Sequence, residues 1–201
     1  MEIKRLLLAT NNPGKVEEMT SLLARENLTL LTPIDIGLTL QVAEIGKSYL
    51  ENATLKAVAF AKASGLVSLA DDSGLEVDAL NGQPGLHSHR FAPWPTASDA
   101  DRRIYLLEKL NLKPRPWLAH FHATIVIASP GGSIGSADGE CLGEIIPEER
   151  GTNGFGYDPI FFIPSFNRTM AELSLHEKNG ISHRACAIHN AEPLISKMLG
   201  F

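Results

Sequence analysis

The chain has 201 residues, of which 44% are hydrophobic and 20% are charged. This length and composition predict a single globular domain over residues 1–201 and exclude disorder as the main state. With 18 Lys and Arg against 23 Asp and Glu, the formal net charge is -5, the wrong sign for a surface that binds nucleic acid by neutralising phosphates. A small anionic ligand stays open, because a few basic side chains can converge locally.

The sequence also bears on where the protein works. Cys141 and Cys186 form neither a disulfide framework nor a metal or redox motif. The early apolar run, Leu6-Leu7-Leu8-Ala9, is too short for a secretion signal. No stretch approaches the roughly 20 apolar residues that span a bilayer. We therefore expect a soluble cytoplasmic protein without a membrane partner.

Hydrophobic periodicity and turn residues predict the secondary structure in chain order. The elements expected in the first half are a strand over residues 3–9, a helix at Lys15–Glu26, a strand at Leu28–Leu31, a helix at Ser48–Ser64, and strands at Leu66–Ala70 and Leu75–Leu80. Those expected in the second half are a helix at Ser98–Leu110, a hairpin of Ala119–Ala128 with Ser133–Gly143, a strand at Ile160–Ile163 and a helix at Ser182–Met198. This order predicts an α/β fold with a mixed, twisted central sheet, flanking helices and a long β-hairpin.

The segment Thr10-Asn11-Asn12-Pro13-Gly14-Lys15 joins the first expected strand to the first expected helix. Backbone N–H groups at a helix start, with a lysine beside them, are suited to bind a phosphate. The same residues fit a capped turn that needs no ligand, and their spacing is not that of a P-loop. Both interpretations stay open here.

Asp71-Asp72 is harder to explain without a ligand. Two adjacent carboxylates repel each other unless a cation or hydrogen-bond donors offset the repulsion. With a polyphosphate nearby, oxygen ligands of this kind indicate Mg²⁺. A solvated turn is the equally weighted alternative, because Asp-Asp-Ser-Gly is common turn chemistry.

Three further segments are candidates for binding. Lys56, with Glu44 upstream of its helix, is most simply a solvated surface lysine. Residues 155–158, Phe-Gly-Tyr-Asp, fit a purine pocket and nearly as well a hairpin corner. Lys178 and Arg184 gather positive charge near a helix start, where the helix dipole disfavours it. That arrangement favours an anion or a carbonyl oxygen as the ligand.

These segments, in this order along the whole chain, resemble the inosine triphosphatase family, the pyrophosphatases of non-canonical purine nucleoside triphosphates. The matching segments are Leu8–Lys15, Tyr49–Ala53 with Lys56-Ala57, Ala70–Leu75, Gly151–Phe162 and Ile181–Arg184. Each segment alone is weak evidence for the family, but the occurrence of all of them in this order is specific to it. The resemblance implies an inosine triphosphatase-like (Maf/Ham-like) fold.

The resemblance implies Mg²⁺-dependent hydrolysis of ITP, dITP or XTP to the monophosphate and pyrophosphate, which cleanses the nucleotide pool. In this reading Lys15, Lys56 and Lys178 neutralise the triphosphate, Glu44 and Asp72 hold the metal, and Asp72 is also the general base. The other substrate-binding residues implied are Thr10, Asn11, Asn12, Pro13, Gly14, Ser73, Phe155, Gly156, Tyr157, Asp158, His183 and Arg184. Family members are commonly homodimers, so a homodimer is expected.

Base selectivity is expected from Phe155, which would stack on the purine, with Asp158, His183 and Arg184 at the purine's edge. Arg184 can only donate hydrogen bonds. It would therefore donate a hydrogen bond to the 6-carbonyl of hypoxanthine or xanthine and oppose the amino group of adenine, so ATP is expected to be rejected.

Two positions depart from the usual family sequence. Ile45 stands where the family has Thr, and His89 stands where it has Ala; we treat the following Arg90 as a loop or interface residue. One alternative is a Maf-like pyrophosphatase acting on pyrimidine or methylated nucleotides. Another is a nucleotide-binding module without turnover, against which Asp71-Asp72 and the three lysines argue.

Overall fold

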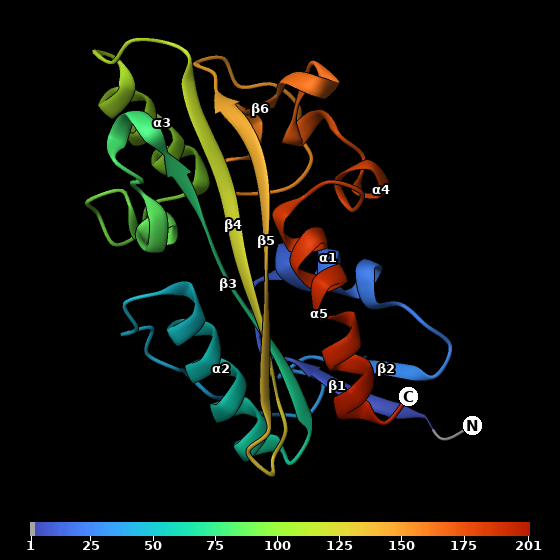
Figure 1. Ribbon diagram of the computed structural model, residues 1–201. Coiled ribbons are helices and arrows are strands. Elements are labelled where there is room, and N and C mark those ends of the chain that lie inside the picture. The colour runs from blue at the N-terminus through green and yellow to red at the C-terminus, as the bar shows by residue number, and fades with distance from the viewer. Residues whose placement is uncertain (1–2) are drawn as a thin grey trace. The chain divides into compact units, whose positions relative to one another are not determined.

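The computed structural model describes residues 3–201 (Figure 1). Across these residues, seven strands form one sheet in the order β2-β1-β3-β4-β5-β6-β7. The strands are β1 (Lys4–Leu8), β2 (Leu28–Leu31), β3 (Val67–Val77), β4 (Trp117–Ala128), β5 (Ile134–Ile145), β6 (Phe161–Ile163) and β7 (Arg168–Thr169). The α-helices are α1 (Pro13–Leu23), α2 (Tyr49–Ser64), α3 (Asp99–Leu110), α4 (Leu175–Lys178) and α5 (His183–Leu199). The mixed α/β fold expected from the sequence is confirmed.

Backbone packing divides the described chain into two compact units. Unit 1 comprises the described residues up to Asp72 together with Ala123–Gly139 and Arg184–Phe201. Unit 2 comprises Ser73–His122 and Glu140–His183. Strands β3, β4 and β5 contribute residues to both units. The single domain over residues 1–201 stays a prediction.

In unit 1, helices cover both faces of the parallel strands β2, β1 and β3 (Figure 1). Leu7 packs with α2 in one hydrophobic cluster, whereas Leu6 and Leu8 pack with α1 and α5 in the other. Successive strand residues point to opposite faces. A parallel strand buried on both sides therefore reads as a continuous apolar run, as β1 does.

Helix α2 has a defined start and a defined end. The Ser48 side chain accepts a hydrogen bond from the Glu51 backbone N–H at 3.1 Å, which satisfies one of the free donors at the helix start. Gly65 ends the helix in the left-handed conformation, with φ +70°, and its N–H donates to the carbonyl of Ala61 at 3.0 Å. The helix expected at Ser48–Ser64 is thus confirmed.

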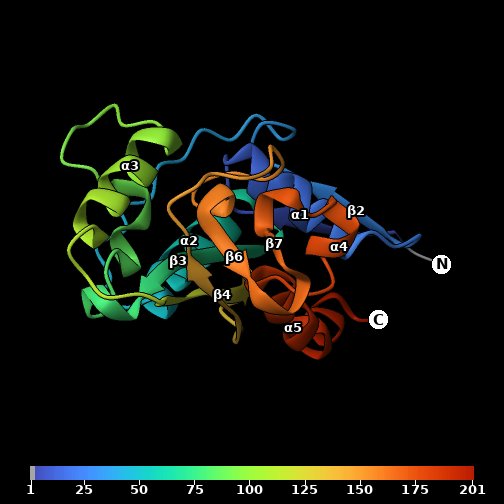
Figure 2. The same ribbon diagram turned by 90° about the horizontal axis from the view of Figure 1, so that it is seen from above.

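Unit 2 has its own hydrophobic core. Leu106 and Leu110 of α3 lie in one buried cluster with Tyr157 and Phe161. Helix α3 begins with a reciprocal capping box between Ser98 and Asp101. Strands β6 and β7 lie side by side and antiparallel (Figure 2). This core supports the segment that follows β5 and leads into β6.

The structure corrects the expectation of two strands at Leu66–Ala70 and Leu75–Leu80. Strand β3 is continuous from Val67 to Val77, and Leu80 belongs to a short 3-10 helix, Asp78–Leu80. Asp71-Asp72 therefore lies within a strand rather than in a turn. The turn chemistry of these residues is overridden because each carboxylate has charged partners, described below.

Smaller differences concern element ends. The helix expected at Lys15–Glu26 spans Pro13–Leu23, because the Asn12 side chain caps it and proline is favoured in its first turn. The hairpin strands are longer than expected at both outer ends. The short strand β7 and helix α4 were not expected. Within residues 3–201, no helix combines the length and apolar character needed to cross a bilayer.

We predict that Gly65→Ala lowers the free energy of unfolding by about 1 kcal/mol, because a side chain disfavours the left-handed conformation. A Cβ at this position would meet nothing within 4 Å, so a steric clash does not contribute to the change in stability. Urea unfolding with an unchanged m-value measures the effect. Gly65→Asn is the matched control and should lose less, because Asn tolerates this conformation; equal stability of Gly65→Ala and the wild type contradicts the argument.

Candidate active site

The loop between β1 and α1 is a capped helix start. The Asn12 Oδ1 atom accepts a hydrogen bond from the Lys15 backbone N–H at 3.0 Å, and the Thr10 hydroxyl accepts one from the Asn12 N–H at 3.1 Å. Pro13 opens the helix. These bonds fix the conformation of the loop at the start of α1.

Asp71 lies on the face of β3 that packs against α1 and α5. Its carboxylate contacts the Lys15 ammonium at 2.7 Å and the Arg184 guanidinium at 3.0 Å. The side chain of Asp71 is fully buried and that of Arg184 is 1% exposed. Burial alone would raise the pKa of the Asp71 carboxyl, but the charges of Arg184 and Lys15 outweigh it and hold that pKa well below its usual range.

Glu18 completes this side of the cluster. It is buried on α1 and forms an ion pair with the Arg184 guanidinium. Glu18 follows Lys15 by three residues, so both side chains lie on one face of the helix. The buried Arg184 therefore has a carboxylate on either side, as a buried cation requires.

Asp72 lies on the opposite face of β3, against α2. The Lys56 ammonium contacts Asp72 Oδ1 at 3.1 Å, Glu44 Oε1 at 3.0 Å and the Asp71 backbone carbonyl at 2.8 Å. The Asn52 side-chain amide donates to Asp72 Oδ2 at 3.1 Å. One lysine thus joins two carboxylates, and one amide holds the second oxygen of Asp72.

Burial governs how these groups titrate. It raises the pKa of the Asp72 carboxyl, although the charge of Lys56 acts in the opposite direction. Burial alone would lower the pKa of Lys56, but attraction to Asp72 and Glu44 outweighs it, so that pKa is raised. Lys56 is therefore a stable cation and Asp72 a stronger base than an exposed carboxylate.

The loop that carries Glu44 is anchored to α2. The Gly46 backbone N–H donates to Asn52 Oδ1 at 2.8 Å, and a Cβ at Gly46 would lie 2.7 Å from that oxygen. No other residue fits so close to the helix. Ile45, where the chain departs from the usual family sequence, is 81% exposed, so its side chain leaves the contact between Glu44 and Lys56 undisturbed.

Residues 155–158 in unit 2 form a tight turn. The Asp158 N–H donates to the Phe155 carbonyl at 3.2 Å, and the Asp158 carboxylate accepts from the Phe155 N–H at 2.9 Å. Gly156 has φ +63° and Tyr157 has φ -96° and ψ 1°. These angles are those of a type II′ turn, which favours glycine at its first central position.

Lys178 joins this turn from α4. Its ammonium contacts the Asp158 carboxylate at 2.5 Å and lies 5.2 Å from the centre of the Phe155 ring. Both members of the ion pair are buried. A Cβ at Gly154 would clash with the Asp158 carboxylate, so the chain needs glycine there.

The structure places the remaining expected residues as follows. His183 is buried in unit 2, with its ring stacked on Phe121 at 4.7 Å and 17°. Ser73 is half-buried and follows Asp72 in β3. Tyr157 is buried, and its hydroxyl donates to the Ser88 carbonyl at 2.8 Å. Arg90 is exposed in the 3-10 helix Gly85–Arg90.

Two clusters result, each within one unit. The ion cluster of unit 1 brings together Lys15, Glu18, Glu44, Asn52, Lys56, Asp71, Asp72 and Arg184. The aromatic turn of unit 2 brings Phe155, Gly156, Tyr157 and Asp158 together with Lys178. Lys178 therefore contacts the expected base-binding residues, whereas Arg184 contacts the carboxylate beside Lys15. The sequence analysis expected Lys178 at the triphosphate and Arg184 at the purine edge, and both roles stay predictions.

Comparison with known proteins identifies relatives over most of the chain. The model of the Ham1 family matches residues 6–193. The chain belongs to the Ham1 family. It is 46% identical to the dITP/XTP pyrophosphatase of Thermus thermophilus over 185 residues, which is 92% of this chain and 88% of that protein. It is 43% identical to the dITP/XTP pyrophosphatase of Desulforamulus reducens over 197 residues, 96% of each.

Solved Ham1 structures share the fold. The HAM1 protein from Coxiella burnetii matches with a TM-score of 0.86 at 38% identity, covering 97% of this chain and 100% of that one. The Ham1 protein of Staphylococcus aureus matches with a TM-score of 0.84 at 37% identity and the same coverage. The family resemblance and the fold expected from the sequence are both confirmed.

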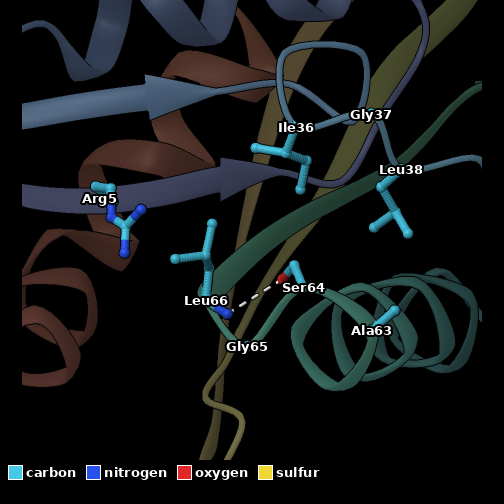
Figure 3. A pocket seen from close by; sticks show the side chains of 8 residues that line it. All are labelled: Arg5, Ile36, Gly37, Leu38, Ala63, Ser64, Gly65 and Leu66. Atoms are coloured by element: carbon cyan, nitrogen blue, oxygen red, sulfur yellow. Dashed lines mark hydrogen bonds between the residues drawn. The ribbon is translucent and has the colours of Figure 1, made fainter.

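A separate pocket of about 400 Å³ lies in unit 1 of this Ham1 chain, beside the end of α2 (Figure 3). Its lining residues are Arg5, Ile36, Gly37, Leu38, Ala63, Ser64, Gly65 and Leu66. None of the expected site residues lines it. The Ser64 hydroxyl donates to the Phe60 carbonyl and accepts from the Leu66 N–H, so it is committed to the end of the helix. We therefore take the ion cluster of unit 1 and the aromatic turn of unit 2, each by itself, as the candidate functional residues.

Sequence reasoning missed two members of the ion cluster. Glu18 lies three residues after Lys15, and Asn52 lies four residues before Lys56. Each shares a helix face with the lysine that was expected. A search for polar residues at these spacings would have found both, because a buried charge needs partners on its own face.

We predict that Asp71→Asn lowers the free energy of unfolding at pH 7 by about 3–5 kcal/mol, because it leaves Lys15 and the buried Arg184 without their shared carboxylate. Since the folded-state pKa of Asp71 is depressed, its contribution is present above the unfolded pKa and is lost as pH falls. The difference between wild type and variant should therefore shrink below about pH 4.

Chemical unfolding at several pH values measures this difference. Glu17→Gln, an exposed substitution on the same helix as Glu18, is the control and should change stability by no more than about 0.5 kcal/mol. A difference for Asp71→Asn that is independent of pH between 3 and 7 contradicts the assignment.

Proposed function

We propose that this chain hydrolyses the triphosphates of non-canonical purines, ITP, dITP and XTP, to the monophosphate and pyrophosphate. The relatives described above carry the name dITP/XTP pyrophosphatase. The observation that carries the proposal is the pair of lysines at Asp71-Asp72. On one face of β3 the Lys56 ammonium contacts both Glu44 and Asp72, and on the other face Lys15 contacts Asp71. This arrangement supplies the cations and the base that phosphoanhydride cleavage needs.

The ion cluster is suited to the triphosphate. A polyphosphate repels an attacking nucleophile until cations cancel and spread its charge, so positioning and electrostatics supply most of the catalysis. Lys15 and Lys56 provide two cations, and the capped loop Thr10–Lys15 brings the start of α1 beside one of them. Arg184, held by two carboxylates, fixes Asp71 and through it Lys15.

Glu44 and Asp72 fit Mg²⁺. Their carboxylate oxygens both contact the Lys56 ammonium, so they already share one positive charge. Mg²⁺ takes one or two carboxylates with water and phosphate rather than a full protein cage. Among residues 3–201 there is no group of three or more His, Cys, Asp and Glu side chains that could hold a metal. When bound, the ion would supply positive charge to the phosphate oxygens.

Asp72 is the proposed general base. Its raised pKa improves its ability to take a proton from the attacking water, since a base works best when its pKa approaches the working pH. Asn52 holds one carboxylate oxygen by a hydrogen bond. That bond fixes the direction in which Asp72 presents its other oxygen.

The aromatic turn is the proposed site for the base. Phe155 offers a half-buried ring, and stacking on an aromatic side chain contributes about 1–3 kcal/mol per base. Asp158, Lys178 and His183 supply the polar groups for the purine edge. The buried contact between Lys178 and Asp158 supports a role for Lys178 at the base rather than at the phosphates. The role expected for Arg184 at the purine edge, favouring a 6-carbonyl over an amino group, stays a prediction. A homodimer and a cytoplasmic location also stay predictions.

We predict that Asp72→Asn lowers kcat for ITP by about 10²–10⁴-fold, the range for loss of a general base, while nucleotide binding stays measurable. Pyrophosphate release and calorimetric binding report the two effects. Asp35→Asn, an exposed carboxylate in the same unit, is the control and should keep full activity. Turnover by Asp72→Asn at the wild-type rate removes Asp72 from catalysis.

We predict that Phe155→Ala raises KM for ITP by about tenfold or more, as expected from loss of one stacked base. Phe166→Ala, a partly exposed Phe of the same unit, should leave KM unchanged. ITP, XTP, ATP, dTTP and UTP are compared at fixed Mg²⁺ by pyrophosphate release. Preference for the pyrimidine nucleotides would instead support the Maf-like alternative.

A further inference from the structure

Two side chains of α3 hold Gly156 from both sides. The Asp99 Oδ2 atom accepts a hydrogen bond from the Gly156 N–H at 2.7 Å. The Arg103 guanidinium donates to the Gly156 carbonyl at 2.8 Å. The first bond fixes the peptide plane before the Gly156 Cα atom and the second fixes the plane after it. Together they restrain both backbone dihedrals of the most flexible residue in the aromatic turn.

This restraint matters because of the turn's conformation. Gly156 has φ +63°, which only glycine adopts readily, and a Cβ there would meet nothing within 4 Å. Packing around the Cα atom therefore does not hold the turn. Glycine also loses more conformational freedom on ordering than any other residue. The contacts with Asp99 and Arg103 supply the order that packing does not.

Both holding side chains are themselves held. Asp99 lies in the first turn of α3, where a carboxylate is favoured by the helix dipole, and it pairs with Arg102. Arg103 donates two parallel hydrogen bonds to Glu149, at 2.8 and 2.9 Å, in addition to the one to Gly156. Such a bidentate pair fixes the plane of the guanidinium. The backbone of Gly156 is thus tied to α3 rather than to another loop.

We propose that Asp99 and Arg103 are positioning residues for base selection, which act through Gly156 by fixing the direction of Phe155. The inference rests on the proposed function, in which Phe155 stacks on the purine. Neither side chain is assigned a contact with substrate. Their role is to keep the aromatic turn in its bound conformation before the nucleotide arrives, so that binding does not bear the cost of ordering it.

This role predicts a particular division between kinetic constants. The turn would bind the purine base, which takes no part in bond breaking. A more mobile turn should therefore weaken binding of the nucleotide, which raises KM, and leave kcat for the chemical step unchanged. Discrimination between ITP and ATP should also narrow, because a mobile turn tolerates either group at the 6-position. A residue that merely stabilises the fold would lower the amount of active enzyme without changing KM or this ratio.

The test uses Asp99→Ala, Arg103→Met and the double variant, with Lys109→Met as the matched control. Lys109 lies on the same helix, where its ammonium faces the Tyr105 ring, 4.9 Å from the ring centre. We expect each single variant to raise KM for ITP by about tenfold, the effect of a lost hydrogen bond to a charged group, with kcat within about threefold. Since both bonds restrain one glycine, the double variant should be little worse than the poorer single variant. Lys109→Met should match the wild type.

Arg103→Lys is the second variant, in case Arg103→Met folds poorly. Lysine keeps the positive charge beside Glu149 but lacks the planar fork that serves Glu149 and Gly156 together. It should raise KM nearly as much as Arg103→Met. An unchanged KM and an unchanged ITP to ATP ratio in every folded variant overturns the inference.

Hydrogen exchange at the Gly156 amide gives a readout that does not depend on turnover. In the wild type this N–H is bonded to Asp99, and Asp99→Ala should accelerate its exchange by about tenfold, whereas Lys109→Met should not. Exchange that is unchanged in Asp99→Ala contradicts the inference even in an active enzyme. A wild type that releases no pyrophosphate from ITP or XTP, yet shows the expected exchange, contradicts the proposed function and the selectivity role together while leaving the restraint of Gly156 supported.

Discussion

The candidate site depends on the alternation of side chains along β3. Asp71 and Asp72 are neighbours in sequence, but in a strand they point to opposite faces. Asp71 meets Lys15 and Arg184 on one face, and Asp72 meets Lys56 and Asn52 on the other. Two carboxylates that would repel each other in a turn are therefore separated by the strand itself, and each receives its own cation. If β3 were interrupted by a turn at this point, the two carboxylates would no longer be separated.

The same alternation divides the work between the helices of unit 1. On one face, α1 supplies both Lys15 and Glu18, and α5 supplies the Arg184 that joins Glu18 to Asp71. Every charge in that group has an oppositely charged neighbour, and the group is nearly closed to solvent, as a buried ion network must be. On the other face, α2 supplies Lys56 and Asn52 around an Asp72 that keeps some exposure. The face with Asp71 is nearly closed to solvent and provides rigidity. The face with Asp72 is more open and provides the proposed catalytic groups.

The sequence was sufficient for the fold class and for most elements, because helix caps, apolar periodicity and short polar segments are local signals. Helix α2 and strand β2 are found where periodicity placed them. The continuity of β3 was not predictable in this way, since turn propensity at Asp71-Asp72 says nothing of cations that arrive from α1, α2 and α5. For the same reason the carboxylate partners of Lys178 and Arg184 were not predictable: a helix start that gathers positive charge does not reveal which carboxylate each cation meets.

The two clusters achieve order by different physical means, and this difference explains why α3 matters. The ion cluster holds itself, because each buried charge would be costly without its partner and the partners come from rigid helices. The aromatic turn is held at Asp158 by its ion pair with Lys178, but space is open around the glycine at its bend, so packing does not fix the Gly156 backbone from within. Its backbone is instead fixed from outside, by a carboxylate and a guanidinium on a well-capped helix. Selectivity for a flat, neutral base requires a surface that is already in place, and a glycine turn provides one only when its peptide groups are held.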